Sequence, residues 1–290
     1  MMMSLPMWPL MALGFSFCGA LIVGFNHYAK IPGAKLVVLR LAGVLPLSLL
    51  SVLLLPWPHD PIFYGVAALM GILLAFSDKL LFDASHVHGG RLASLYIPMK
   101  MLVGFALWGL LMPSSVTMLL AEPWRAVLVV FGFILCSHAL WGMRKHETSK
   151  AAILAVVPVA VLLALGDVVA KSALGSPEGG MAHVVGSAAA FLTVTTGVGS
   201  LVGMVMAGKF RPTAREVLLS AMFGALLMAS LCVFLVTLAL APNPGYVGAI
   251  TMLSSFWLAL HGYFHHGERA NWWHGVLLLG GAIVVAVGAA

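Results

Sequence analysis

The chain has 290 residues, of which 62% are hydrophobic and 8% are charged, and its mean hydropathy is +1.07. Soluble domains carry about 25% charged residues, so this composition excludes a soluble globular protein and predicts a membrane protein. The net charge of +6 comes from 15 basic residues spread over short segments, which excludes a nucleic-acid-binding face.

Ten apolar segments follow one another along the chain, separated by short turns rich in Pro and Gly. A helix needs about 20 mostly apolar residues to cross a bilayer, and these segments lack the alternating polarity of barrel strands. We therefore expect an all-α, multi-pass protein of the plasma membrane, which is the inner membrane in a bacterium. The expected spans are 8–28, 36–55, 61–82, 92–112, 124–142, 151–174, 182–207, 215–240, 246–264 and 272–287.

Basic residues are concentrated in the loops that follow the first, fifth, seventh and ninth spans. Because cytoplasmic loops are enriched in Lys and Arg, these loops are predicted to be cytoplasmic and both termini are predicted to lie outside. The basic residues of these loops are Lys30, Lys35, Arg144, Lys145, Lys150, Lys209, Arg211, Arg215 and Arg269.

Charged residues inside the second and third spans are candidates for gate or structural roles. Arg40 is expected to reach the headgroups or to form a structural gate pair, the alternative being a substrate anion. Lys79 and Asp83 are four residues apart and are expected to pair with each other. Asp78 faces about 100° away from Lys79, which makes it a candidate partner for Lys100 or for a coupling ion.

Lys100 lies near the middle of the fourth span, where an ionisable group should face protein or water. Tyr96, Lys100, Gly104 and Trp108 follow at spacings of four and form one stripe of the helix. Two interpretations stay open. Either the stripe is a cavity wall on which Lys100 binds an anionic or zwitterionic substrate, or Lys100 is neutralised by a structural carboxylate from another helix or held uncharged by burial.

Asp167 and Lys171 stand four residues apart in the sixth span, with the acid first, as in a favourable intrahelical pair. A plain interfacial salt bridge is one interpretation. The other is a substrate site in which Asp167 acts as a protonation switch, since a desolvated carboxyl can hold a proton near neutral pH.

The ninth span carries Thr251, Ser254, Ser255 and His261 roughly on one face. They are candidate substrate contacts, although hydroxyls in membrane helices often bond only to the preceding turn.

Four histidines, His86, His88, His265 and His266, lie in the turns after the third and ninth spans, but no two share the i,i+4 spacing of a metal site. We therefore expect neither a metal nor a cofactor.

An internal repeat relates the two halves of the chain. The stretch 124–134 matches 273–283 in its Trp, Val, Leu, Gly and Ile positions, and Ala12-Leu13-Gly14 recurs as Ala164-Leu165-Gly166. A unit of five helices inserts with opposite topology in its two copies, as in many secondary transporters. The expected repeats, within one membrane domain, are 1–146 and 147–290.

The C-terminal part of the chain resembles the end of an EamA-type repeat of the drug/metabolite transporter superfamily. The resemblance rests on residues 240–253, on Gly267-Glu268, on Trp273-His274-Gly275 and on residues 280–283, and Val37-Val38-Leu39-Arg40 resembles that family's arginine-bearing second helix. The first half departs from the pattern, because no Gly-Glu pair ends its fourth span and the loop 113–123 is longer. The resemblance implies a ten-helix carrier whose central cavity is lined by spans 1, 3, 4, 6, 8 and 9, and whose relatives mostly export or exchange small metabolites, amino acids or amphiphiles.

The expected function is a secondary transporter, an exporter or exchanger of a small polar or amphiphilic metabolite, that alternates access around a midplane cavity with proton coupling or exchange. We expect a monomer or homodimer in the lipid bilayer. The sequence has no Walker motif and no loop long enough for an ATPase. The alternative is an intramembrane enzyme for a lipid-linked substrate, with Asp78, Asp83, His86 and His88 at its site.

Overall fold

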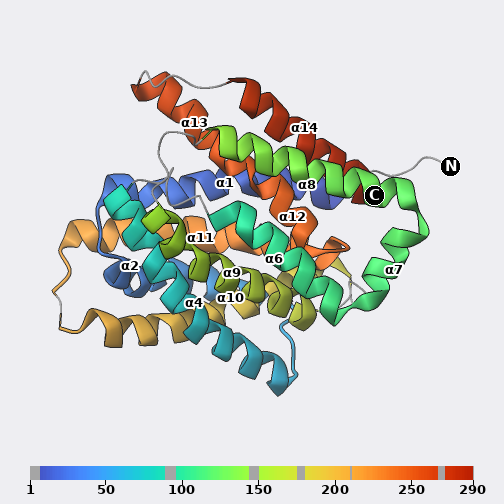
Figure 1. The fold of residues 1–290 in the computed structure, drawn as a ribbon. Coiled ribbons are helices and arrows are strands. Elements are labelled where there is room, and N and C mark those ends of the chain that lie inside the picture. The colour runs from blue at the N-terminus through green and yellow to red at the C-terminus, as the bar shows by residue number, and fades with distance from the viewer. Residues whose placement is uncertain are drawn as a thin grey trace.

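The computed structural model describes residues 7–88, 96–143, 150–174, 180–209, 211–266 and 272–289. All regular elements of these residues are helices (Figure 1). The side chains of His86, His88, Tyr96, His265 and His266 lie outside the described part, as do Gly267-Glu268. The helices are α1 Met7–Ala29, α2 Gly33–Leu39, α3 Leu41–Leu54, α4 Pro61–His88, α6 Tyr96–Leu111, α7 Pro113–Ala121, α8 Pro123–Met143, α9 Lys150–Leu174, α10 Met181–Ala207, α11 Ala214–Leu240, α12 Pro244–Thr251, α13 Leu253–His266 and α14 Trp272–Ala289.

Each expected apolar segment overlaps one helix or two consecutive helices. Among the described residues, eight helical segments are long and apolar enough to cross a membrane, and Trp273–Ala289 is a shorter apolar helix. Segments Met99–Leu111 and Pro113–Ala121 form a further apolar pair, bent by 101°. The chain is thus built from several membrane-length helices, while the number of ten crossings stays a prediction.

The structure corrects the expected loop at 113–123, which forms the short helix α7. Pro113 occupies its first turn, a position where the missing N–H of proline costs no hydrogen bond and its fixed φ favours a helix start. A proline that was expected to mark a loop therefore starts a new helix in a different direction.

Two of the expected spans are divided into two helices by a one-residue break. The residue is Arg40 between α2 and α3 and Met252 between α12 and α13, and both keep helical φ and ψ, so each pair runs on as one membrane-length segment. Gly224 of α11 lies directly against the first break, because a Cβ on Gly224 would collide with the carbonyl oxygen of Arg40. This close approach lets α11 pack against the break.

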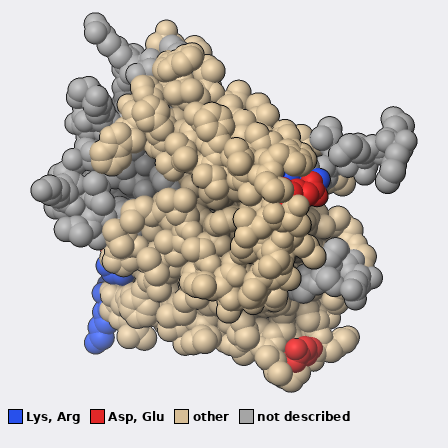
Figure 2. All heavy atoms as spheres, turned by 45° about the vertical axis from the view of Figure 1, so that its right-hand side comes forward, with Lys and Arg blue, Asp and Glu red and all other residues tan. Residues whose placement is uncertain are grey.

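The outer surface is largely apolar. Large hydrophobic side chains such as Leu53, Leu110 and Val205 are exposed, as expected where lipid replaces water as the solvent. Figure 2 shows one face on which the described charged side chains are few and lie near the edges. The core contains fully buried side chains from both halves of the chain, including Met101, Leu140, Phe223, Met252 and Leu278.

Helices α8 and α14 pack along each other (Figure 1) through small residues. A Cβ on Gly132 would lie 2.6 Å from Val285 Cγ2 and 2.9 Å from the carbonyl oxygen of Gly281. A Cβ on Gly281 would lie 2.7 Å from Cys136 Sγ and 3.0 Å from the carbonyl oxygen of Gly132. The later residue of α8, Cys136, contacts the earlier residue of α14, Gly281, while Gly132 contacts Val285. The two helices are therefore antiparallel, and their contact is reciprocal.

Candidate functional site

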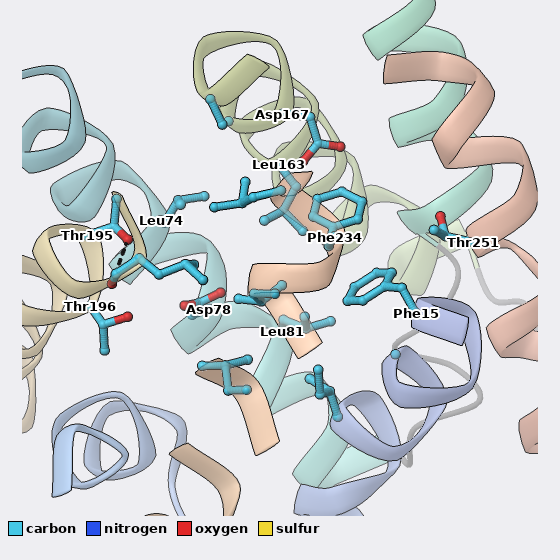
Figure 3. A pocket seen from close by; sticks show the side chains of 18 of the residues that line it. Phe15, Leu74, Asp78, Leu81, Leu163, Asp167, Thr195, Thr196, Phe234 and Thr251 are labelled. Atoms are coloured by element: carbon cyan, nitrogen blue, oxygen red, sulfur yellow. Dashed lines mark hydrogen bonds between the residues drawn. The ribbon is translucent and has the colours of Figure 1, made fainter. Parts of the chain in front are cut away.

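A cavity of about 160 Å³ lies among the helices at the centre of the molecule (Figure 3). Its walls come from α1, α4, α6, α9, α10, α11, α12 and α13 and from the break between α2 and α3. Most of its lining is aliphatic or aromatic, and a few polar groups are set into this apolar wall. The charged and hydroxyl-bearing lining residues are Arg40, Asp78, Lys100, Asp167, Thr195, Thr196, Thr251 and Ser254.

The first ion pair of the cavity joins α6 to α9. Lys100 Nζ lies 2.8 Å from Asp167 Oδ2, and the two side chains are 16% and 13% exposed. Lys100 Nζ also lies 4.9 Å from the ring centroid of Phe234, a distance at which the ring face attracts a cation. Lys100 therefore lines the cavity and is paired with a carboxylate from another helix, the two situations that the sequence left as alternatives.

The second ion pair joins the α2–α3 break to α4. Arg40 Nη1 donates to Asp78 Oδ2 at 2.6 Å, and the Arg40 side chain is 5% exposed. Of the two roles expected for Asp78, the pairing with Lys100 is not found, because Asp78 pairs with Arg40 and Lys100 with Asp167; the role in binding a coupling ion stays a prediction. Arg40 is buried against Asp78 and the ring of Phe82 and does not reach the headgroups, so of the expectations for this residue the structure shows a pair inside the protein.

Lys171 does not pair with Asp167 as its spacing predicted. Its ammonium donates to the carbonyl oxygens of Leu238 at 2.8 Å and of Ala241 at 2.5 Å, and it lies 5.1 Å from the ring centroid of Trp108. Helix α11 ends at Leu240, so Lys171 satisfies carbonyl groups that the helix end leaves without partners. Neither Lys171 nor Trp108 is among the described residues that line the cavity.

Three further predicted residues lie away from the cavity lining. Lys79 and Asp83 form the expected pair, with 2.7 Å between Nζ and Oδ2. The other oxygen of Asp83 accepts the Gly33 N–H at 2.7 Å and so holds the N-terminus of α2. His261 is exposed, and its Nε2 lies 2.8 Å from the hydroxyl of Tyr28, which links α13 to α1.

The hydroxyls of α12 and α13 divide into different roles. Thr251 lines the cavity, but its hydroxyl donates to the carbonyl oxygen of Gly248 in its own helix at 2.9 Å. Ser254 also lines the cavity and is 2% exposed, and its Oγ has no hydrogen-bond partner among the described residues. Ser255 is buried beside it and is not a lining residue.

Sequence reasoning missed several lining residues, although the sequence contains signals for three of them. Thr195 and Thr196 are adjacent hydroxyls in the seventh span, which also carries Ser187, Thr193 and Ser200. Phe15 follows Ala12-Leu13-Gly14 as Asp167 follows Ala164-Leu165-Gly166, and both lie in the cavity wall. The site therefore combines two partly buried ion pairs with aromatic and hydroxyl groups, which suits an amphiphilic small molecule.

No protein-family model matches the chain. No curated protein is significantly similar to it. A solved structure, described only as a crystal structure of a protein, is similar over 99% of both chains with a TM-score of 0.65 at 13% sequence identity. At this identity the similarity concerns the fold alone, so the arrangement of helices has a counterpart among experimentally determined structures.

Proposed function

We propose that the protein is a secondary transporter, an exporter or exchanger of a small polar or amphiphilic metabolite, that moves two five-helix halves around the central cavity. The observation that carries this proposal is the cavity itself, where Arg40, Asp78, Lys100 and Asp167 are brought together from apolar helices. Ionisable groups at such depth are costly and mark substrate or ion pathways.

Matched packing partners support the two-repeat architecture. If α1, α3, α4 and α6 of the first half correspond to α9, α10, α11 and α12–α13 of the second, three of the larger helix contacts have counterparts. Helix α1 packs on α11 as α9 packs on α4, and α6 packs on α9 as α12 and α13 pack on α1. Likewise α4 packs on α10 as α11 packs on α3.

The α8–α14 contact supports an inverted relation between the repeats. Gly132 and Gly281 occupy equivalent places in the sequence repeat, as do Cys136 and Val285. The contact of Gly132 with Val285 therefore corresponds to that of Gly281 with Cys136. Two equivalent, antiparallel helices in reciprocal contact are related by an axis perpendicular to them, which for membrane helices lies in the membrane plane.

The resemblance to EamA-type drug/metabolite transporters is part of the same proposal. The overlap of the apolar segments with helices supports it, as does the lining of the cavity by the first, third, fourth, sixth, eighth and ninth of these segments. The seventh segment and Arg40 of the second also contribute to the wall.

The ion pair of Lys100 and Asp167 gives the cavity a means of coupling ligand binding to motion. Lys100 belongs to the first half and Asp167 to the second, so their contact crosses from one half to the other. A ligand that engages either charge weakens this link and favours relative movement of the halves. Protonation of Asp167 would act in the same direction, which makes this residue the proposed site of proton coupling.

The test starts with a thermal-shift screen of the purified protein against amino acids, nucleosides, organic acids and quaternary amines, because a ligand of the folded state raises its apparent stability. The flux of each compound that stabilises the protein is then measured in vesicles that contain the reconstituted protein.

We expect Lys100→Ala and Asp167→Asn to reduce this flux to background without loss of folded protein. Lys79→Ala, which removes an ion pair outside the cavity, is the matched control. Wild-type flux through the Lys100 variant would contradict the proposed site.

The alternative of an intramembrane enzyme has less support. The carboxylates of Asp78 and Asp83 are both held in ion pairs, with Arg40 and Lys79. The side chains of His86 and His88 lie outside the described residues.

A further inference from the structure

The charges that line the cavity balance one another. Two cations, Arg40 and Lys100, face two anions, Asp78 and Asp167, and each cation is hydrogen-bonded or ion-paired with one anion. A ligand with a net charge would leave one charge of the wall or of the ligand uncompensated in an apolar setting, which is strongly unfavourable. The cavity therefore favours a ligand whose formal charges sum to zero.

The Lys100–Asp167 pair offers two complementary contacts to such a ligand. An ammonium group of the ligand can replace Lys100 on the carboxylate, while a carboxylate of the ligand replaces Asp167 on the ammonium. This exchange keeps every charge paired, and both residues remain partly exposed to the cavity. The Arg40 side chain is more deeply buried than that of Lys100 and is held by Asp78, so Arg40 is the less accessible of the two cations.

Ser254 supplies an uncharged contact. A buried hydroxyl without a partner is unfavourable, yet Ser254 Oγ is in this condition among the described residues, on a side chain that faces the cavity. Thr251 beside it already bonds to its own helix. In Figure 3 the rings of Phe15 and Phe234 lie between Thr251 on α12 and Asp78 on α4. A ligand thus meets apolar surface together with separate charged and hydroxyl groups.

We infer that the transported molecule is a zwitterion without net charge that also carries an uncharged hydrogen-bonding group, and that Ser254 is the residue that selects for this group. The inference rests on the proposed transport function. A hydroxyl can donate and accept, so Ser254 fits a hydroxyl, carbonyl or amide of the ligand. An analogue that lacks the group leaves Ser254 unpaired and binds more weakly, which is how buried polar groups generate specificity.

The experiment measures binding of matched probes to the detergent-purified protein by thermal shift and titration. Phenylalanine with tyrosine, and valine with threonine, are zwitterion pairs that compare members with and without a hydroxyl. Phenethylamine and 3-phenylpropanoate keep the aromatic body of phenylalanine but carry one net charge. We expect zwitterions to raise the melting temperature and the two charged analogues to leave it unchanged. In at least one pair the hydroxyl-bearing member should bind about tenfold more tightly.

Ser254→Ala should abolish this preference, so that the two members of the pair bind equally, while Ser254→Thr should retain it. Ser77→Ala and Ser220→Ala are matched controls. Both serines are fully buried with hydroxyls that lack a partner among the described residues, and neither lines the cavity. These two variants should keep the wild-type preference.

Four results would overturn the inference: no probe stabilises the protein, a charged analogue stabilises it as well as phenylalanine does, no pair is distinguished, or the preference survives in Ser254→Ala. Vesicle flux separates this failure from failure of the proposed function. If a compound with a net charge shows Lys100-dependent flux, the proposed transport function stands and the inference of a zwitterionic substrate is overturned. If zwitterions bind but no flux is measured, the proposed transport function is overturned and the inference of a zwitterion-binding site stands.

Discussion

At the scale of single residues, the chain uses its few intramembrane charges in distinct ways. Lys100 and Asp167 meet across the two halves inside the cavity, whereas Lys171 serves the end of α11. The spacing of four residues made a pair of Asp167 with Lys171 one of two interpretations. This pair does not form, because Asp167 pairs with Lys100 of another helix, and local spacing contains no information on which helices are neighbours.

Lys171→Met should lower the stability of the protein without altering the cavity. The substitution leaves the carbonyls of Leu238 and Ala241 without the Lys171 ammonium, and a buried polar group without a partner costs about 1–3 kcal/mol. Thermal unfolding of the purified protein in detergent measures the effect. Lys79→Met is the control, because its half-exposed pair with Asp83 should contribute less than about 1 kcal/mol. Equal melting temperatures for the two variants would contradict the capping role.

At the scale of elements, the length of the apolar segments predicted where helices occur. It did not predict the interruption at Arg40 or the additional helix α7. At Arg40, Gly224 of α11 leaves room for the Arg40 carbonyl group, which is a contact between two elements. The helix α7 depends on a proline that starts a helix as readily as it ends one. Both features arise from geometry between elements or from an ambiguous residue, so the hydrophobic pattern alone does not contain them.

Gly224→Ala should destabilise the α3–α11 contact. Its methyl group would collide with the carbonyl oxygen of Arg40, and overpacking of this kind typically costs about 1–3 kcal/mol. Gly65→Ala is the matched helical control, since a Cβ at Gly65 meets no atom within 4 Å and alanine favours a helix by about 1 kcal/mol over glycine. We expect the melting temperature to fall for the first variant and to stay equal or rise for the second.

At the scale of the whole molecule, sequence composition predicted a helical membrane protein, and the structure confirms its all-helical, membrane-length construction. The cavity could be predicted only as a list of charges. The cavity wall is formed by contacts between segments far apart in the chain, such as Arg40 with Asp78 and Lys100 with Asp167. The apolar lining residues were the hardest to predict, because Phe15 and Phe234 look like any other aromatic residues of a membrane helix.

Orientation is a property of the whole chain that the basic loops predict. Lys30 and Lys35 lie at the end expected to be cytoplasmic, and the C-terminus is expected outside. A reporter enzyme that is active only in the cytoplasm, fused after Ala290, should therefore be inactive, whereas one active only outside should work. The opposite result would invert the predicted topology.

The contact between Lys171 and the end of α11 also bears on the ionic conditions in which the protein works. Three carbonyl oxygens, from Leu238, Ala239 and Ala241, converge on one ammonium group. Carbonyl oxygens at the C-terminal end of a helix carry the negative end of its dipole, which favours a cation beside them. Lys171 supplies this cation from within the chain, so the end of α11 needs no dissolved cation to meet these carbonyl groups.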